Sequence, residues 1–224
     1  MLQSAIWIAR EQCWLGDNIL GSDLCFDVEI RIGAGSYVCG EETAMLESLE
    51  GRRGMVRAKP PLPAIKGLFG TPTVINNVLT IASVPSILAR GAEAYAALGQ
   101  NRSLGTQVFQ LGGNIARGGI VETAFGISAK ELIEDFGGGT RSGRPLRAVQ
   151  IGGPLGAYLR PEKLDVAMEY EALIEAGGMI GHGGVVLFDD SVNMAEQARF
   201  AMDFCVEESC GKCCLLYTSP SPRD

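Results

Sequence analysis

The sequence has little of what marks a membrane protein, a secreted protein or a nucleic-acid-binding protein. Among its 224 residues no apolar run reaches the length of a bilayer span, and the amino terminus lacks the basic-then-apolar pattern of an export signal. The net charge is -7, and no cluster of Lys and Arg interleaved with aromatic residues offsets it. We therefore expect a cytoplasmic protein with no direct membrane insertion and no nucleic-acid partner.

Histidine is also scarce, whereas cysteine is not. The single histidine, His182, sits in a glycine-flanked turn and is expected to be structural. Seven cysteines without an export signal argue against a disulfide framework, because cytosolic thiols stay reduced and their clusters more often bind metals or do redox chemistry. Three of them are crowded near one end: Cys210, Cys213 and Cys214.

The composition, 46% hydrophobic and 20% charged, is enough for a buried core. In the first hundred residues the pattern predicts a helix that stops near Gly16, a half-buried strand, a second helix, an irregular proline-rich loop and a third helix. The corresponding ranges are 2–15, 26–31, 41–49, 59–72 and 78–89.

A second unit is predicted from about residue 105. Strands over 106–111, 119–123 and 146–151 and a capped helix over 128–136 give the order β-β-α-β, which suits a small β-grasp module. Further elements follow: a helical stretch over 161–176, a buried strand over 184–188, and a helix over 192–206 capped by Asp190 or Ser191. Residues 214–224 resemble no folded element.

The glycine-rich stretch 33–40 follows the predicted strand and precedes a helix, where free backbone N–H groups favour an anionic ligand such as a phosphate. It is neither a P-loop nor a G-x-G-x-x-G motif, so a simple glycine-rich turn is the alternative. Glu41 and Glu42 follow in the first helical turn. They either stabilise the helix dipole or, beside this loop, suit a site that tunes a flavin or accepts a nicotinamide.

Two further pairs have open interpretations. The C-x-x-C spacing of Cys210 and Cys213 lets two thiolates reach one iron-sulfur cluster or one zinc, but a redox-active thiol pair fits equally well. Asn76 and Asn77 suit the cap of the following helix, and as ligand contacts they would offer neutral donors to ribityl or phosphate oxygens.

Taken together, several segments resemble the NADH-binding flavoprotein family, and the resemblance covers almost everything before Cys214. This family comprises the 51 kDa subunit of respiratory complex I and its relatives in NAD-dependent formate dehydrogenases and NAD-reducing hydrogenases. The segments are G-A-G-S-Y-V-C-G-E-E-T at 33–43, L-E-S-L-E-G at 46–51, K-P-P at 59–61, P-T-V-I-N-N-V at 72–78 and E-S-C-G-K-C at 208–213. The last of these and G-M-I-G-H-G-G at 178–184 look most like the formate dehydrogenase β subunit.

The resemblance implies an α/β protein with a Rossmann-like flavin/NAD-binding domain, an SLBB-like β-grasp domain and the start of a C-terminal helical iron-sulfur domain. The boundaries expected on this basis are 1–100 for the C-terminal part of the FMN/NAD-binding domain, 101–165 for the β-grasp domain, 166–190 for a return segment to the flavin domain, 191–213 for the start of the iron-sulfur domain, and 214–224 for a non-native tail.

The implied activity is electron transfer between NAD(H), FMN and a [4Fe-4S] cluster. A nicotinamide exchanges two electrons and a cluster one, so the flavin is the required intermediary. The implied partners are a small [2Fe-2S] subunit and a large catalytic subunit. A complex I NADH-binding subunit is the alternative within the family, and a non-enzymatic β-grasp and thiol assembly module is the alternative outside it.

Carried over residue by residue, the family pattern places the nicotinamide and flavin site at Gly40, Glu41 and Glu42. Glu41 and Glu42 are the catalytic residues that the resemblance implies. The pattern likewise assigns FMN contacts to Asn76 and Asn77, and the first two cluster ligands to Cys210 and Cys213. Two departures stand out: the family's upstream G-R-G-G-A-G-F-P-T-G segment is missing, and Leu216 occupies the third ligand position. We therefore expect a truncated internal fragment with an incomplete cluster-binding set and no activity of its own.

Overall fold

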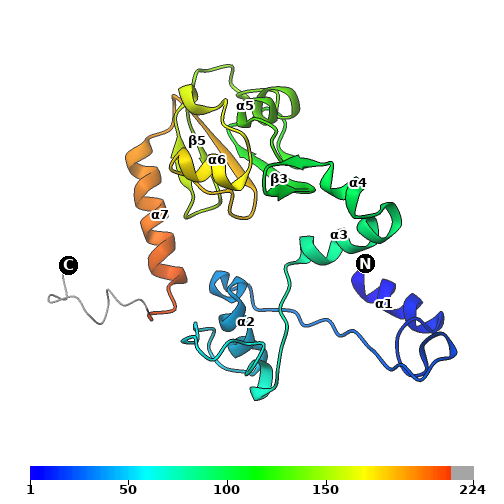
Figure 1. The fold of residues 1–224 in the computed structure, drawn as a ribbon. Coiled ribbons are helices and arrows are strands. Elements are labelled where there is room, and N and C mark those ends of the chain that lie inside the picture. The colour runs from blue at the N-terminus through cyan, green and yellow to red at the C-terminus, as the bar shows by residue number, and fades with distance from the viewer. Residues whose placement is uncertain (213–224) are drawn as a thin grey trace. The chain divides into compact units, whose positions relative to one another are not determined.

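The computed structural model describes residues 1–212, and the chain forms two compact units. The first unit comprises Met1–Ile75 together with the chain from Glu208 onward, and the second comprises Asn76–Glu207 (Figure 1). In the part of the chain that is described, no helix is both long and apolar enough to cross a bilayer.

The first unit has little regular structure. Its helices are α1 (Leu2–Glu11) and α2 (Glu42–Leu49), and its short 3-10 turns lie at Ile19–Gly21, Tyr37–Gly40 and Leu68–Gly70. The helix predicted over 2–15 is confirmed, but it ends at Glu11 because Cys13 already has a positive φ of 54°. The irregular loop predicted over 59–72 is also confirmed, apart from its short 3-10 turn.

The strand predicted over 26–31 is wrong. Only Phe26 makes a β-bridge, to Gly16, and the following residues pair with no strand in the described chain. Alternating apolar residues form a strand only where a neighbouring strand accepts and donates the ladder hydrogen bonds. Here Val28 and Ile32 are 37% and 94% exposed, so the alternation does not create a buried face.

The second unit contains the remaining elements. They are α3 (Val78–Arg90), α4 (Ala92–Ala96), β1 (Gly99–Gln100), β2 (Ser103–Leu104), β3 (Thr106–Gly113), β4 (Gly119–Ala124), α5 (Ala129–Glu131) running into a π-helical turn (Leu132–Phe136), β5 (Leu146–Ile151), β6 (Ala157–Leu159), a 3-10 turn (Pro161–Lys163), α6 (Tyr170–Glu175), β7 (Gly184–Asp189) and α7 (Met194–Glu208).

Five of the strands form one mixed sheet in the order β4-β3-β7-β5-β6. Strands β3 and β7 are parallel, with Gln110 opposite Gly184, and every other neighbouring pair is antiparallel. The predicted strands of this unit are confirmed, and the chain is a mixed α/β protein. Strand β7, which the sequence predicts as a buried strand, is the central strand of this sheet.

The hydrophobic core of the second unit lies against one face of this sheet. Along β3 every second residue is buried, including Phe109 and Leu111, because successive side chains of a strand point to opposite faces. The core also includes Leu132 and Ile133 of the π-helical turn, Val149 and Ile151 of β5, Leu173 of α6, and Val185 and Leu187 of β7. In Figure 1, α5 and α6 lie beside the strands of this unit.

Several helices of the second unit begin at polar caps, whereas α4 begins at Gly91 without one. Ser128 and Glu131 form the reciprocal hydrogen bonds of a capping box at α5, as the sequence predicts. Helix α7 is capped by Asn193 rather than by Asp190 or Ser191. The reason is competition, since Asp190 pairs with Arg144 and the Ser191 hydroxyl donates to Asp189.

The helical stretch predicted over 161–176 consists of two short pieces. A 3-10 turn at Pro161–Lys163 is followed by non-helical backbone, and α6 begins only after Glu169, whose side chain accepts a hydrogen bond from the Ala172 N–H. Between them, Leu164 and Met168 are buried in the core. Burial of these two side chains therefore outweighs the local preference for one continuous helix.

Candidate functional site

Glu41 caps α2 with its own side chain. Its Oε2 atom accepts hydrogen bonds from the Thr43 N–H at 2.9 Å, the Ala44 N–H at 2.8 Å and the Thr43 hydroxyl at 2.6 Å. The first N–H groups of a helix have no partner within the helix, and a carboxylate there also interacts favourably with the helix dipole. The sequence predicted an acid at the start of this helix, and the structure shows which groups hydrogen-bond to its carboxylate.

The hydrogen bonds keep Glu41 ionised. Partial burial raises the pKa of the Glu41 carboxyl, but donation from Thr43 and Ala44 and the positive charge of Lys59 outweigh this effect, so the pKa lies below its ordinary value. A carboxylate with a lowered pKa is a fixed negative charge and a hydrogen-bond acceptor at neutral pH. It is poorly suited to carry a proton.

Glu42 has a different role from its neighbour. Its carboxylate pairs with the Lys59 ammonium group, and this hydrogen bond raises the pKa of Lys59. The two side chains are 39% and 37% exposed, so the pair is accessible to solvent. Lys59 offsets one of the two adjacent negative charges, which reduces the repulsion that an anionic ligand would meet at the start of α2.

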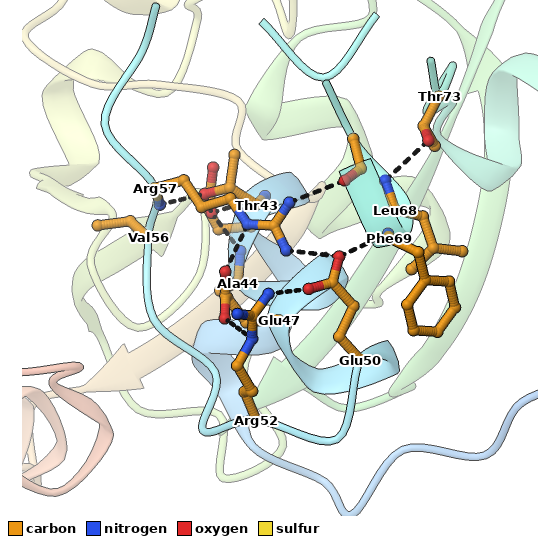
Figure 2. A network of polar contacts seen from close by, with 12 residues as sticks. Thr43, Ala44, Glu47, Glu50, Arg52, Val56, Arg57, Leu68, Phe69 and Thr73 are labelled. Carbon is orange, nitrogen blue, oxygen red and sulfur yellow. Dashed lines mark hydrogen bonds and ion pairs between the residues drawn. The ribbon is translucent and has the colours of Figure 1, made fainter. Parts of the chain in front are cut away.

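A network of two acids and two arginines lies behind the cap of α2 (Figure 2). The Arg57 guanidinium contacts Glu47 at 2.5 Å and Glu50 at 2.9 Å, and Arg52 pairs with the same two carboxylates. The Glu50 side chain is only 6% exposed and also accepts a hydrogen bond from the Phe69 N–H at 2.7 Å. The network therefore joins α2 to the two loops that follow it.

The glycine-rich stretch before α2 has open space beside its backbone. A methyl group placed on Gly33, Gly35 or Gly40 would meet no atom within 4 Å, and Gly35 has a φ of +92°. The stretch is exposed up to Tyr37, whose N–H donates to Glu208 at 2.9 Å. An uncovered backbone next to an ionised acceptor fits one wall of a site for a planar ring and ribose hydroxyls, which is the chemistry of FMN and NAD.

Asn76 and Asn77 belong to the second unit, and both are exposed. The Asn77 side chain accepts a hydrogen bond from the Leu79 N–H at 2.8 Å, so it caps α3, as one of the two interpretations of the sequence expected. Asn77 also lines a cavity of about 660 Å³ together with Gln107 and His182. The His182 ring itself packs against the backbone of Gly153 and Gly184, where added methyl groups would lie 2.7 Å and 2.6 Å from it.

Cys210 lies two residues beyond the end of α7, and its partner Cys213 lies outside the described residues. Hydrogen bonds from the backbone N–H groups of Lys212 and Val56 lower the pKa of the Cys210 thiol. The Lys212 ammonium group also donates to the Val56 carbonyl at 2.8 Å. These contacts favour the thiolate, which is the form that binds metals.

The described residues do not by themselves fit a four-iron cluster. Over residues 1–212 no three His, Cys, Asp or Glu side chains come together in a way that could hold a metal ion. A cluster of this kind needs four thiolate ligands, and of the two predicted ligands only Cys210 lies within the described residues.

Comparison with known proteins gives a consistent result. Residues 1–86 match the family described as the Nuo51 FMN-binding domain. The chain is 46% identical to the HndC subunit of the NADP-reducing hydrogenase of Solidesulfovibrio fructosivorans. The match extends over 212 residues, which is 95% of this chain and 43% of that protein. Over the same share of this chain it is 41% identical to a protein of the NADH-quinone oxidoreductase of Escherichia coli and covers 48% of it. The chain thus spans about half the length of these curated relatives.

A solved structure, that of an NAD⁺-reducing [NiFe]-hydrogenase in the air-oxidized state, is similar with a TM-score of 0.76 and 35% sequence identity. The similarity covers 84% of this chain and 32% of the hydrogenase chain. These matches show that residues 1–86 resemble an FMN-binding domain and that the chain is similar to subunits of a hydrogenase and of an NADH-quinone oxidoreductase. The chain is therefore similar to the NADH-binding flavoproteins that the motifs of its sequence resemble, and the matched FMN-binding domain lies within residues 1–86.

The sequence alone assigned no role to three residues of this region: Thr43, Arg57 and Lys59. Thr43 is part of the recognised motif, but its burial and its double hydrogen bond are tertiary facts. The acids at positions 47 and 50 are one helical turn apart and signal a shared cationic partner. No local pattern distinguishes Arg57 from the nearby basic residues as that partner.

Proposed function

We propose that this chain supplies part of the nicotinamide and flavin site of an NAD(H)-dependent electron-transfer subunit. The observation that carries the proposal is that the FMN-binding domain match, residues 1–86, contains the glycine-rich stretch that ends at the ionised Glu41 cap. In this proposal Gly40 and Glu41 line the site, and Glu42 with Lys59 sets the local charge. Glu41 and Glu42 are the residues proposed to act in catalysis.

The proposed cofactors are FMN and NAD, and FMN when bound supplies the exchange between hydride transfer and single-electron transfer. The residues of this chain position the ligand and supply the charge beside it. Glu41 accepts a hydrogen bond from the ligand while remaining ionised, and the exposed backbone around Gly40 lets a planar ring approach closely. Asn76 and Asn77 are proposed to donate to FMN from the start of α3.

Cys210 and Cys213 are proposed as ligands of a [4Fe-4S] cluster. Support comes from the backbone donors that favour a thiolate at Cys210 and from the C-x-x-C spacing. Because the described residues do not complete a cluster site, only these two ligands are proposed for this chain.

The second unit is proposed to be a β-grasp domain of the SLBB type. Two features of its mixed sheet support this assignment. The first long strand, β3, pairs in parallel with the last strand, β7, and helix α5 follows the β3–β4 hairpin. The domain would extend to β7, so the boundary proposed at residue 165 moves to about residue 190. The segment from residue 191 is proposed to begin the helical iron-sulfur domain.

The proposed partners are the other subunits of a redox complex, including a small [2Fe-2S] subunit and a large catalytic subunit. The first unit exposes several large apolar side chains, which supports a covering polypeptide. These include Trp7 at 62%, Trp14 at 58%, Phe26 at 65%, Ile32 at 94% and Phe69 at 73%.

The substrate of the whole complex is proposed from the names of the relatives and from two sequence segments. The relatives are named as hydrogenase and NADH-quinone oxidoreductase subunits, which favours a complex I or hydrogenase setting. The formate dehydrogenase β subunit, indicated by the segments at 178–184 and 208–213, is retained as the second candidate. Three assays of the purified complex distinguish these settings: reduction of NAD⁺ by formate, reduction of NAD⁺ by hydrogen, and oxidation of NADH by a quinone.

The test of the proposal is cofactor content and dye reduction. The holoenzyme that contains this chain is purified, its flavin is identified after acid release, and NADH-dependent reduction of an artificial electron acceptor is measured. We expect FMN in stoichiometric amount and activity that falls in Glu41→Gln. Purified holoenzyme without flavin and without NADH-to-dye activity would instead support the assembly-module alternative.

A further inference from the structure

The Thr43 hydroxyl is buried and makes two hydrogen bonds. The residue is 1% exposed, and its Oγ1 donates to Glu41 Oε2 at 2.6 Å and accepts from the Arg57 N–H at 2.8 Å. A backbone N–H can only donate, so it occupies a lone pair of the hydroxyl oxygen. An ionised carboxylate can only accept, so the single hydroxyl proton is directed to Glu41.

The Arg57 backbone is itself held in place from its side chain. The guanidinium group contacts Glu47 at 2.5 Å and Glu50 at 2.9 Å (Figure 2). It also donates to the Gly67 carbonyl at 3.1 Å. Three contacts to two different segments fix the position of the Arg57 N–H. The Arg57 residue thus links the ion-pair network, which its guanidinium group enters, to the hydrogen bonds that run from its backbone N–H through Thr43 to the Glu41 carboxylate.

The two oxygens of Glu41 are not equivalent. The two N–H groups and the hydroxyl that cap the side chain all donate to Oε2, and none of the three donates to Oε1. Glu41 is partly exposed, whereas Thr43 behind it is buried. One oxygen is thus used to fix the side chain, and the other is left to accept a hydrogen bond from a ligand.

We propose that Thr43 is a positioning residue that fixes the Glu41 carboxylate in the orientation that binds NAD(H). This inference rests on the proposed function, and it adds a residue that acts through Glu41 without touching the ligand. Arg57 takes part through its backbone, because its N–H sets the direction of the Thr43 proton. A hydrogen bond to a charged group is stronger than one between neutral groups, so its loss is measurable in ligand binding.

The test is the dissociation constant of NAD⁺ as a function of pH, measured by titration calorimetry on the oxidised holoenzyme. Thr43→Val keeps the shape of the side chain and removes the hydroxyl, and we expect about tenfold weaker binding at neutral pH. Below neutrality we expect its binding to fail at a higher pH than in wild type, because Glu41 has lost a hydrogen bond that favours its ionised form. Thr43→Ser retains the hydroxyl and is expected to bind within about twofold of wild type.

A double-mutant cycle separates positioning from general destabilisation. In a Glu41→Gln background there is no carboxylate to orient, so adding Thr43→Val is expected to weaken NAD⁺ binding by less than about twofold further. If the two substitutions are additive, or if Thr43→Ser binds as weakly as Thr43→Val, Thr43 does not act through Glu41 and the inference is wrong. Thr43→Ala serves in the same way where Thr43→Val does not accumulate as folded protein.

The wild-type titration distinguishes this inference from the proposed function. Wild-type holoenzyme that binds no NAD⁺ contradicts the function itself. Wild-type protein that binds NAD⁺, together with Thr43→Val protein whose dissociation constant and pH dependence match wild type, contradicts only the role of Thr43.

Discussion

Gly67 lies where two loops of the first unit turn back on each other. Its N–H donates to the Thr71 carbonyl at 2.8 Å, and its carbonyl accepts from the Arg57 guanidinium at 3.1 Å. A methyl group on Gly67 would lie 2.4 Å from the Thr73 side chain and 2.8 Å from the Pro63 carbonyl oxygen. The lack of a side chain is therefore a packing requirement at this position.

We expect Gly67→Ala to lower the free energy of unfolding by about 1–3 kcal/mol, because backbone and Cβ atoms must move to make room. Gly33→Ala is the matched control, since a methyl group there meets no atom within 4 Å and is expected to change stability by less than about 0.5 kcal/mol. Chemical denaturation of the two variants measures the difference. Equal stabilities would contradict the packing around Gly67.

Asp189, at the end of β7, makes stability depend on pH. It is 1% exposed, and hydrogen bonds from the Ser191 and Ser142 hydroxyls lower the pKa of its carboxyl. A lowered pKa in the folded state means that the stabilising effect is complete above the ordinary pKa of an aspartate. It is lost as the pH falls through the lower, folded-state value.

We therefore expect the amide protons of β7 to exchange faster on acidification below about pH 4, beyond the intrinsic pH effect. Asp189→Asn is expected to be less stable at neutral pH and to lose this acid dependence. Hydrogen exchange measured by mass spectrometry checks both, with the exposed Asp165→Asn as control. An acid response in Asp189→Asn that equals that of wild type would show that Asp189 is not its source.

At the scale of elements, the ion-pair network behind α2 contains two arginines with the same partners and different exposure. The Arg57 side chain is 23% exposed, whereas that of Arg52 is 60% exposed. Removing the less exposed arginine leaves Glu47 and the nearly buried Glu50 with only one guanidinium partner, whereas an exposed arginine contributes little.

Arg57→Met is thus expected to lower the free energy of unfolding by about 3 kcal/mol, and Arg52→Met by less than about 1 kcal/mol. Both substitutions remove one positive charge and keep the aliphatic part of the side chain, so the comparison isolates burial. Denaturant unfolding of the two variants is the measurement. A larger effect for Arg52→Met would contradict the geometry of the network.

The Asn77 cap of α3 has both a structural and a proposed ligand role. Asn77→Asp retains a side-chain acceptor for the Leu79 N–H, so helix stability is expected to stay within about 0.5 kcal/mol of wild type, whereas Asn77→Ala is expected to lose about 1 kcal/mol. If Asn77 also contacts FMN, the added negative charge of Asn77→Asp lowers FMN affinity. If Asn77→Asp retains FMN as well as wild type does, Asn77 caps α3 but does not contact FMN.

The elements also show what the sequence could and could not predict. The strands of the second unit and helices α2 and α3 were predictable because their signals are local: alternating burial, caps and terminal glycines. The predicted strand at 26–31 was wrong because strand formation depends on a partner that a local pattern does not reveal. The central place of β7 in the sheet was likewise beyond reach, since it depends on parallel pairing with β3, more than seventy residues earlier.

The candidate site divides in the same way. Glu41 was predictable as an acid in the first turn of a helix, and its likeness to a flavoprotein motif gave it a role. The contribution of Thr43, the choice of Arg57 as the partner of two acids, and the pairing of Lys59 with Glu42 depend on how loops fold back over α2. Such long-range contacts have no signature in a single sequence.

At the scale of the whole molecule, the two units contribute different things to one proposed electron-transfer subunit. The first unit carries Gly40, Glu41, Glu42 and Cys210, and the second carries Asn76, Asn77 and a well-packed mixed sheet. Among the described residues, only the second unit buries a substantial apolar core of its own. We therefore expect the first unit to depend for its order on the flavin and on neighbouring polypeptide.

The central claim, that this chain belongs to a subunit in which NADH reduces bound FMN, is tested most directly by anaerobic titration of the purified holoenzyme with NADH. Bleaching of the visible flavin absorbance by NADH, and its slower or incomplete bleaching in Glu41→Gln, is the predicted result. Flavin absorbance that NADH leaves unchanged in the wild-type holoenzyme would contradict the account.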